Sequence, residues 1–444
     1  MKSIHYAFLT IMLVICGLWL TTAGAQATLA EFWSIRKSLL FETGIIATAA
    51  MSITVLLAVR HLFPDSFLDG LDKRYRLHKW LGIVAFSAAV AHWLIKTAPK
   101  WMIDLGLLTK PVKNKVLSDA PVSWFYEFTD FQQHFAKDIG EWAFYLFVAL
   151  SLLILIKKIP YKQARQSHKL MAVVYLAIAY HSFILMKIED WSTPVGVLMA
   201  VLLLLGTLGA LTSLFGQIGY SKKTYGEISE LRRYKDNKVL AVTIRPTTPW
   251  AGHQPGQFAF VTFDKKEGAH PFSIASDWAE QKGISFKIKQ IGDYVNTLPA
   301  TLSVGQEVVI EGPYGNFNFS SDKAQQIWVA GGIGIAPFFS KLEQLAGQRK
   351  PQNIDLFYAT AMPDADFINK LQALADNARI RLHITNTKQQ GYLTAQAIET
   401  FISDLHSTDF WVCGPAKLGD ALKSHFVGNG LHHSDFHQEL FEMR

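Results

Sequence analysis

Four histidines stand at matched positions in two apolar stretches of the chain. His78 and His92 open and close "HKWLGIVAFSAAVAH", and His168 and His181 open and close "HKLMAVVYLAIAYH". An imidazole in hydrocarbon is costly unless it has a partner, and haem iron accepts imidazole as an axial ligand. At 1.5 Å per residue, each pair spans about 20 Å along a helix. Two histidine pairs at two depths therefore predict two bis-imidazole haems stacked across a membrane; helix-capping or interface histidines are the alternative.

The spacing within the two stretches differs by one residue. The 14 residues from His78 to His92 place both rings near one helix face. The 13 residues from His168 to His181, at about 100° each, leave the second ring well off the face of the first. Either that helix is locally irregular or its two haems are approached from different azimuths. No Pro or Gly lies between these two histidines to explain a kink.

The helices that must hold these histidines belong to an apolar half of the chain. Residues 1–215 contain nearly all the long apolar runs, while residues 220–444 have the composition of an ordinary soluble domain. The first apolar run also fits a signal peptide, because it has a basic start, an apolar middle and an Ala-Gly-Ala ending. Each run is near the roughly 20 residues that cross a bilayer. The six candidate spans are 5–23, 39–59, 78–97, 139–156, 169–187 and 194–215.

Loop charges predict the orientation of these spans. The loops 60–79 and 157–169 carry ten Lys and Arg in 33 residues, against nine in 64 for the loops on the other side. The side with the denser positive charge is cytoplasmic. The N-terminus and the soluble half are therefore expected inside the cell, and His78 and His168 lie nearer the inner edge than their partners.

Charge and cysteine content exclude other classes of protein. The net charge of +7 does not predict a nucleic-acid partner, because the basic residues sit mainly in short loops between apolar segments. Cys16 lies in an apolar run and Cys413 in the soluble half, so neither a disulfide framework nor a cysteine metal site is available. The sequence also shows no inverted repeat and no interrupted apolar segment, the two features that would favour a transporter.

Residues 239–319 predict a small antiparallel barrel. The segments "VLAVTIRP", "GQFAFVTF", "ISFKIKQIG" and "QEVVIEGPYG" alternate and are separated by turn signals. The compact unit "HPFSIAS", residues 270–276, interrupts them, and taken alone it fits any turn and strand. Later, "KQIGDYVNTL" supplies a glycine before a predicted helix N-terminus, a local structure that can face a pyrophosphate.

From residue 327 the pattern changes to alternating strands and helices. "IWVAGGIGIAPFFSKLEQL" has an apolar strand, a Gly-rich turn and an amphipathic helix, which favours close approach of a pyrophosphate. The strands "IDLFYAT" and "DFWVCGP" follow at βαβ distances. A parallel sheet is therefore expected. Taken alone, Cys413 fits a small buried apolar residue as well as it fits a residue of a functional site.

These motifs together resemble the ferric reductase / NADPH oxidase superfamily, in the form of a bacterial transmembrane protein with a ferredoxin-reductase-type FAD/NAD(P) domain. The resemblance covers residues 38–444, and "GLDKRYRLHK" before the third span is also similar to bacterial members. It implies a membrane α-helical bundle, a soluble β-barrel FAD lobe and an α/β NAD(P) lobe. The expected boundaries are 1–215 for a six-helix haem domain, 216–322 for the FAD lobe and 323–444 for the NAD(P) lobe.

The resemblance also implies which residues serve each cofactor. The four histidines are the ligands of two b-type haems. FAD would lie against His270, Pro271, Phe272, Ser273, Lys289 and Gly292, although Val295 stands where relatives often have Thr. NAD(P)H would lie against Gly331, Gly332, Gly334, Thr360, Gly414 and Pro415, with Cys413 beside the nicotinamide. The tail "HQELFEMR" would place Phe441 by the isoalloxazine and Glu439 nearby, with a frayed tail as the alternative.

The function so implied is a transmembrane oxidoreductase of the bacterial inner membrane with a cytoplasmic flavoprotein domain. Electrons would pass from NAD(P)H to an outside acceptor, either oxygen or ferric iron; a subunit that feeds a periplasmic protein partner is the alternative. Ala361 and Met362 follow the strand "LFYAT", which disfavours strict NADPH use, although Lys388 is available from the next loop. Lys96, one turn outward of His92, could hold a haem propionate or attract an anionic acceptor.

A long outer loop, residues 98–138, is also expected to act at the acceptor end. Its aromatic residues could cover the outer haem, or they could form an ordinary interfacial belt. The residues concerned are Trp101, Trp124, Phe125, Tyr126 and Phe128, with His134 close to the next span.

Overall fold

The chain divides into two compact units. A computed structural model describes residues 2–20, 31–64, 68, 70–110, 124–156, 161–279, 282–346 and 353–439. The first unit comprises Met1–Phe63 and Lys73–Ile218, and the second comprises Pro64–Asp72 and Gly219–Arg444. The predicted boundaries of the three domains stay predictions.

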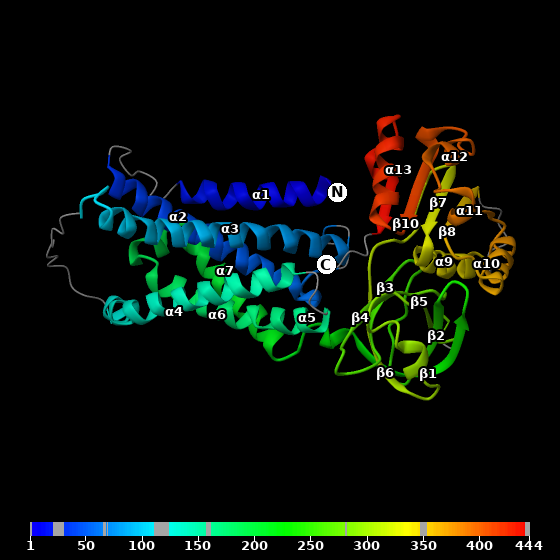
Figure 1. Ribbon diagram of the computed structural model, residues 1–444, viewed down its shortest axis with the longest axis horizontal. Coiled ribbons are helices and arrows are strands. Elements are labelled where there is room, and N and C mark those ends of the chain that lie inside the picture. The colour runs from blue at the N-terminus through cyan, green and yellow to red at the C-terminus, as the bar shows by residue number, and fades with distance from the viewer. Residues whose placement is uncertain are drawn as a thin grey trace. The chain divides into compact units, whose positions relative to one another are not determined.

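The first unit is a bundle of long helices that run side by side (Figure 1). Its helices are α1 (Lys2–Trp19), α2 (Phe32–Ala58), α3 (Leu71–Asp104), α4 (Trp124–Leu155), α5 (Tyr161–Lys169), α6 (Met171–Leu185) and α7 (Pro194–Leu214). The start of α7 shows why its residues form a helix there. Thr193 accepts a hydrogen bond from the Gly196 amide, and Pro194 at the first turn has no N–H that would need an acceptor.

Five of these segments are long and apolar enough to cross a membrane: Phe32–Ala58, Leu71–Asp104, Trp124–Leu155, Lys162–Leu185 and Pro194–Leu214. Large apolar side chains such as Leu204, 62% exposed, point outward from the bundle, as expected where lipid replaces water. Five predicted spans are thus matched by described helices. The first coincides with the shorter apolar helix Ile4–Trp19, so a sixth crossing stays a prediction.

The prediction of a long outer loop over residues 98–138 was wrong in part. Trp101 lies on α3, which continues to Asp104, and α4 already begins at Trp124. The other aromatics of that group and His134 therefore lie on α4, while residues 111–123 are outside the described residues. The hydropathy signal ended at the charged residues near each helix end, although the helical hydrogen bonds continue past them.

The helix that carries His168 and His181 is irregular, as one of the two sequence-based explanations required. Between α5 and α6, the amide of Leu170 bonds to the carbonyl of Ser167 at 3.0 Å, which is a 3₁₀ step. Such a step adds about 20° of rotation, against an offset of about 140° for 13 residues at 100° each. Most of the offset is left, so approach from different azimuths applies as well.

The core of the bundle lies between α2, α3, α4, α6 and α7. Tyr175 of α6 is fully buried and shares a 2.9 Å hydrogen bond with Ser52 of α2. Thr48 and Ser182 form a second link between the same two helices, at 2.8 Å. These pairs satisfy polar groups where lipid offers no partner, and they hold α6 in register with α2.

A curled six-stranded antiparallel sheet forms the first part of the second unit. Its strand order is β4-β3-β6-β1-β2-β5. The strands are β1 (Lys223–Tyr234), β2 (Val239–Pro246), β3 (Phe258–Thr262), β4 (His270–Ser273), β5 (Ile284–Lys289) and β6 (Glu307–Tyr314), with the short helix α8 (Leu298–Thr301) before β6. An isolated bridge between Ile274 and Phe286 links the two ends of the sheet. The predicted barrel is confirmed, and "HPFS" is one of its strands, paired with β3.

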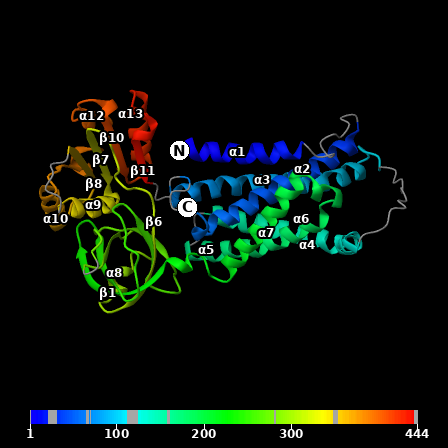
Figure 2. The ribbon, with the colours of Figure 1, turned by 180° about the vertical axis from the view of Figure 1, so that it is seen from behind.

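A five-stranded parallel sheet follows, in the order β11-β10-β7-β8-β9. Its strands are β7 (Gln325–Gly331), β8 (Ile354–Thr360), β9 (Arg381–Asn386), β10 (Thr408–Cys413) and β11 (Phe436–Glu439). The helices α9 (Ala336–Ala346) and α10 (Ala365–Asn377) cover one face, while α12 (Ala395–Glu399) and α13 (Ala416–Gly428) cover the other (Figure 2). The strand order reverses between β7 and β10. Ligands of such sheets bind at the carboxyl ends of the strands at this reversal.

Candidate functional site

The two histidines predicted for the inner depth of the bundle lie face to edge. The ring centroids of His78 on α3 and His168 on α5 are 5.9 Å apart, with an angle of 70° between the ring planes. The Nδ1 of His78 lies 2.9 Å from the carbonyl oxygen of Thr54 on α2. The structure thus brings together the pair that the depth argument predicted.

The two histidines predicted for the outer depth each bond to a helix backbone. The Nδ1 of His92 lies 2.9 Å from the carbonyl oxygen of Leu40 on α2, and the Nδ1 of His181 lies 2.8 Å from that of Ala136 on α4. The hydroxyl of Thr43 is also 3.4 Å from the Nδ1 of His92. His92 lies within electrostatic range of His181.

A carbonyl oxygen accepts only, so the Nδ1 of each ring in these three bonds must carry the proton. The Nε2 of His78, His92 and His181 is then left with its lone pair, which is the atom that a haem iron takes. Backbone carbonyls that fix the tautomer in this way are the usual support of metal-bound histidine. Within the described ranges, no group of three or more His, Cys, Asp or Glu side chains could hold a metal ion. The donor sets are pairs of neutral imidazoles, which fit haem.

A charged group stands one turn outward of His92. The ammonium of Lys96 lies 2.8 Å from the carboxylate of Glu141 on α4, and Tyr145 donates to the same carboxylate at 2.9 Å. Trp93 stacks on Phe144 of α4 beside this group, with centroids 5.5 Å apart. Lys96 thus has a carboxylate partner from the protein itself, which the sequence did not reveal.

Pro99 removes a helical hydrogen bond from α3 just beyond that group, and Arg36 replaces it with a side-chain hydrogen bond. Pro99 lies inside α3 and has no N–H, so the carbonyl of Ile95 loses its helical donor. The Nε of Arg36 donates to that carbonyl at 3.0 Å, and its Nη2 donates to the carbonyl of Lys96 at 3.2 Å. This contact ties α2 to the outer end of α3.

The two predicted flavin elements meet in the barrel. The rings of His270 in β4 and Tyr294 stack with centroids 4.8 Å apart, and the ring of Phe272 lies nearly parallel to His270 at 6.5 Å. Burial raises the pKa of Tyr294 to about 12, so its phenol stays protonated. Gly292, just before it, has a φ of +91°, which favours glycine. Tyr294 was not among the predicted site residues, although its place just after the predicted turn was a signal.

The two predicted nicotinamide motifs also meet, at the carboxyl ends of β7 and β10. Cys413 pairs with Ala330 in the parallel ladder. A Cβ on Gly334 would lie 2.6 Å from the carbonyl carbon of Cys413, and a Cβ on Gly331 would lie 2.7 Å from Pro415. The glycines are therefore required for the two loops to pack, and the loops lie at the reversal of strand order. Thr360 ends β8 beside them and is buried.

Lys289 connects the flavin and nicotinamide elements. Its ammonium is 3.7 Å from the position that a Cβ on Gly332 would take. Burial lowers the pKa of Lys289. The end of β5 is thus adjacent to the Gly-rich turn after β7, which brings together residues that the sequence assigned to different cofactors.

Cys413 is fully buried, and its environment makes it a poor nucleophile. Burial raises the pKa of its thiol well above the usual value, and the carboxylate of Glu439 acts in the same direction. Glu439 lies on β11 directly beside Cys413 in the ladder. The thiol stays neutral, so its contribution is one of packing beside the ligand. Phe441 lies outside the described residues.

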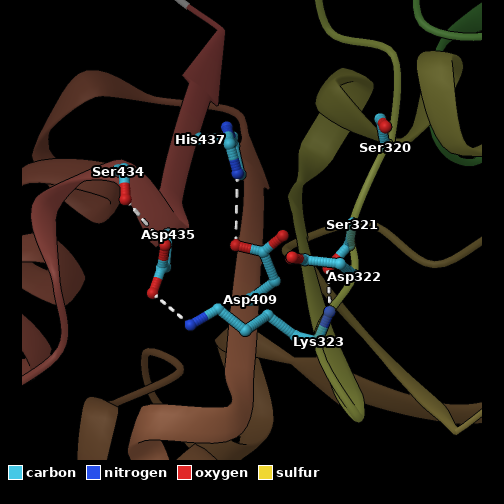
Figure 3. Close-up of a pocket in the computed structure, with 8 residues that line it drawn as sticks. All are labelled: Ser320, Ser321, Asp322, Lys323, Asp409, Ser434, Asp435 and His437. Carbon is cyan, nitrogen blue, oxygen red and sulfur yellow. Dashed lines mark hydrogen bonds and ion pairs between the residues drawn. The ribbon is translucent and has the colours of Figure 1, made fainter.

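A polar pocket lies at the opposite end of the same strands (Figure 3). It is lined by charged and polar side chains and not by glycine-rich loops. Lys323 lies 2.7 Å from Asp435, and His437 lies 3.2 Å from Asp409. His437 also stacks on Trp411 with centroids 3.9 Å apart. These charged side chains pair with one another at the amino ends of β7 and β10, away from the nucleotide motifs.

Family models match three consecutive parts of the chain. Residues 43–179 match the ferric reductase like transmembrane component, residues 226–318 an FAD-binding domain, and residues 328–423 an oxidoreductase NAD-binding domain. Three of the four histidines lie inside the first match, and the fourth, His181, lies two residues beyond its end.

Curated relatives resemble part of the chain. The glycine betaine monooxygenase reductase subunit of Chromohalobacter salexigens is 25% identical over 205 residues, which is 42% of this chain and 56% of that protein. The toluate 1,2-dioxygenase electron transfer component of Pseudomonas putida is 25% identical over 236 residues, 51% of this chain and 68% of that protein. The chain thus spans little more than half the length of the first of these relatives.

Solved structures give weaker similarity. A flavohemoglobin from Malassezia yamatoensis has a TM-score of 0.49 and 15% identity, over 90% of this chain and 96% of that one. The FAD/NAD-binding domain of a nitric oxide dioxygenase from Vibrio cholerae has a TM-score of 0.43 and 18% identity, over 49% and 98%. The three domain matches in sequence establish the assignment instead: a ferric reductase-like transmembrane domain precedes FAD- and NAD-binding domains, so the chain has the ferric reductase-like, NADPH oxidase-type architecture.

Proposed function

We propose that this protein takes electrons from NAD(P)H on the cytoplasmic side of a bacterial inner membrane and delivers them to an acceptor on the other side. The observation that carries the proposal is the geometry of the histidines. The two inner rings are 5.9 Å apart, and three of the four Nδ1 atoms bond to backbone carbonyls, which leaves Nε2 available. Four imidazoles at matched positions in apolar helices, three of them oriented by backbone carbonyls, have little other use in hydrocarbon.

Two b-type haems, FAD and NAD(P)H would supply the electron chemistry when bound, the haems and FAD as carriers and NAD(P)H as hydride donor. His78 and His168 would hold the inner haem, and His92 and His181 the outer one. The absence of a C-x-x-C-H sequence indicates non-covalent haem. The strand β4, Lys289 and Gly292 would hold FAD, with Tyr294 supporting His270 by stacking.

The remaining residues bind and orient the nicotinamide. The two loops at the carboxyl ends of β7 and β10, which pack closely because Gly331 and Gly334 have no side chain, would bind the nucleotide through Gly331, Gly332, Gly334, Gly414 and Pro415. Cys413, neutral and buried, would pack beside the nicotinamide without sharing in proton transfer. Lys388, on the short helix α11 (Thr387–Gln390), is the cation available to a 2′-phosphate, and we expect no strict preference for NADPH.

Oxygen, giving superoxide, and ferric iron are the acceptors that we propose. A periplasmic protein partner is the second candidate. In support of that candidate, one of the two curated relatives above is a monooxygenase reductase subunit and the other is an electron transfer component of a dioxygenase.

A single preparation tests the proposal. Purified full-length protein should contain two haems per chain, and NAD(P)H under anaerobic conditions should reduce both when FAD is present. His181→Ala should lose the outer haem and keep flavin reduction. Full haem content in that variant would contradict the pairing. Comparing steady-state rates with ferric chelate and with oxygen then separates the acceptors, and failure with both would favour a protein partner.

A further inference from the structure

The two outer histidines bond to backbone that follows one pattern. His92 bonds to the carbonyl of Leu40 on α2, and His181 bonds to that of Ala136 on α4. Neither helix carries any of the four histidines. In both helices a glycine stands four residues after the accepting carbonyl, Gly44 in α2 and Gly140 in α4.

The position of these glycines follows from helix geometry. Residues i and i+4 lie on the same helix face, one above the other, and the amide of i+4 bonds to the carbonyl of i. A ring that reaches the carbonyl of residue i from directly above residue i+4 therefore leaves no space for a side chain at i+4.

The available space differs between the two helices. A Cβ on Gly140 would lie 2.6 Å from the Cγ of His181 and closer still to its Nδ1 and Cε1, which is an overlap. A Cβ on Gly44 would lie 3.2 Å from the Cε1 of His92 and 3.3 Å from its Nδ1, which is tight but needs only a small shift. Ala136, which supplies the carbonyl for His181, is itself small and fully buried.

The inner pair does not use this arrangement. His78 bonds to the carbonyl of Thr54 on α2, and the residue four positions later is Ala58, which has a Cβ. The glycine pattern therefore belongs to the outer pair.

We propose that Gly44 and Gly140 are positioning residues of the outer haem site, and that Gly140 is the stricter of the two. They allow the rings of His92 and His181 to lie flat against α2 and α4, so that the Nδ1–H of each ring is held by a carbonyl and Nε2 faces the haem. This inference rests on the proposed function, because it assigns the ligands to an outer haem.

Three single variants of the full-length protein test the inference: Gly140→Ala, Gly44→Ala and, as matched control, Gly17→Ala. Gly17 is exposed on α1, which carries none of the four histidines, and a Cβ there would meet no atom within 4 Å. The readouts are haem per chain and the low-spin ferric electron paramagnetic resonance signals of the two haems. FAD retention reports on the integrity of the soluble half.

Gly140→Ala should lower the haem content from two towards one per chain, with the inner signal unchanged and FAD retained. Gly44→Ala should keep both haems and shift the outer signal alone. Gly17→Ala should match the unsubstituted protein. Two haems and unchanged signals in Gly140→Ala would overturn the inference, as would equal loss of both haems.

If Gly140→Ala yields no folded protein, Gly44→Ala decides the question. An outer signal identical to that of the unsubstituted protein would overturn the inference, and a selective shift would support it. A failure of the proposed function gives a different result, since the unsubstituted protein would then contain no pair of low-spin haems.

Discussion

The candidate sites of the two halves of the chain are built differently. The transmembrane half would bind its cofactors through side chains, and the flavoprotein half through the backbone. In the bundle, the groups that would meet a cofactor are side-chain nitrogens, and backbone carbonyls orient them, as Leu40 does for His92. In the flavoprotein half, the groups that would meet a nucleotide are backbone atoms at Gly334 and Gly414, and the lack of a side chain brings them together. The surroundings explain the difference, because in hydrocarbon the helical backbone bonds to itself and cannot serve as a ligand.

This comparison predicts where a single added methyl group does most damage in the flavoprotein half. Gly334→Ala should lower the rate of flavin reduction by NAD(P)H about 100-fold, which corresponds to about 2.7 kcal/mol. The new Cβ would meet backbone atoms of Cys413 and Gly414, which cannot rotate away as a side chain could. Anaerobic stopped-flow absorbance at the flavin band measures the rate.

The matched control for that variant is Gly428→Ala on α13, where a Cβ would meet nothing within 4 Å. It should reduce flavin at the unsubstituted rate, and both variants should keep their haems. A Gly334→Ala protein with more than half the normal rate would break the comparison, since the glycine would then not set the nucleotide site.

What the sequence could predict follows the same division. The four histidines and the two glycine motifs were evident because each depends on residue type, and strands such as β2 and β8 were found almost to the residue. Strand β1 was missed, because the outward side chains of "KTYGEISELRRY" are charged and mask the alternation. Carbonyls such as that of Ala136 carry no sequence signal, since every residue has one.

Long-range pairing was also hidden from the sequence. Lys96 was expected to face a propionate or an acceptor, but Glu141, 45 residues later, reaches it. The outer ends of α3 and α4 were assigned to a loop because Pro99 and nearby charges end the apolar run. The contact of Arg36 with the freed carbonyl shows how the helix continues.

A second prediction concerns Lys287, where the flavoprotein half does depend on a buried side chain. Its ammonium lies 3.9 Å from the ring centroid of Phe339, and burial lowers its pKa from 10.5 to about 7. Lys370 on α10 lowers it further, while Glu343 on α9 partly offsets the effect. Between pH 7 and 10.5 the unfolded chain binds the extra proton, so this residue makes stability rise with pH, by at most about 1.4 kcal/mol per unit.

Lys287→Met should remove that dependence and raise the stability at pH 7 by about 1–3 kcal/mol, because a buried ammonium is costly. The loss of the contact with Phe339 is worth only about 1 kcal/mol in the other direction. Thermal release of FAD fluorescence from the full-length protein at pH 7, 8 and 9 measures the effect. The exposed Lys282→Met serves as control, and a Lys287→Met protein that is less stable at pH 7 would contradict the argument.

The smallest expected effect lies at the predicted outer edge of the bundle, where the carboxylate of Glu141 pairs with the ammonium of Lys96. Glu141 neutralises Lys96 one turn from His92, so Glu141→Gln should leave a free cation there and raise the rate with an anionic ferric chelate about threefold. Both groups are partly exposed, so the gain should fade at high salt as screening shortens the range of the charge to about 3 Å at 1 M. The oxygen rate should stay the same, since oxygen carries no charge. Lys96→Gln should lower the chelate rate instead, and the double variant should resemble Lys96→Gln. Equal changes with both acceptors would show that Lys96 acts on the haem itself. Lys96 would then be a side chain that serves the cofactor, as His92 and His181 are proposed to be.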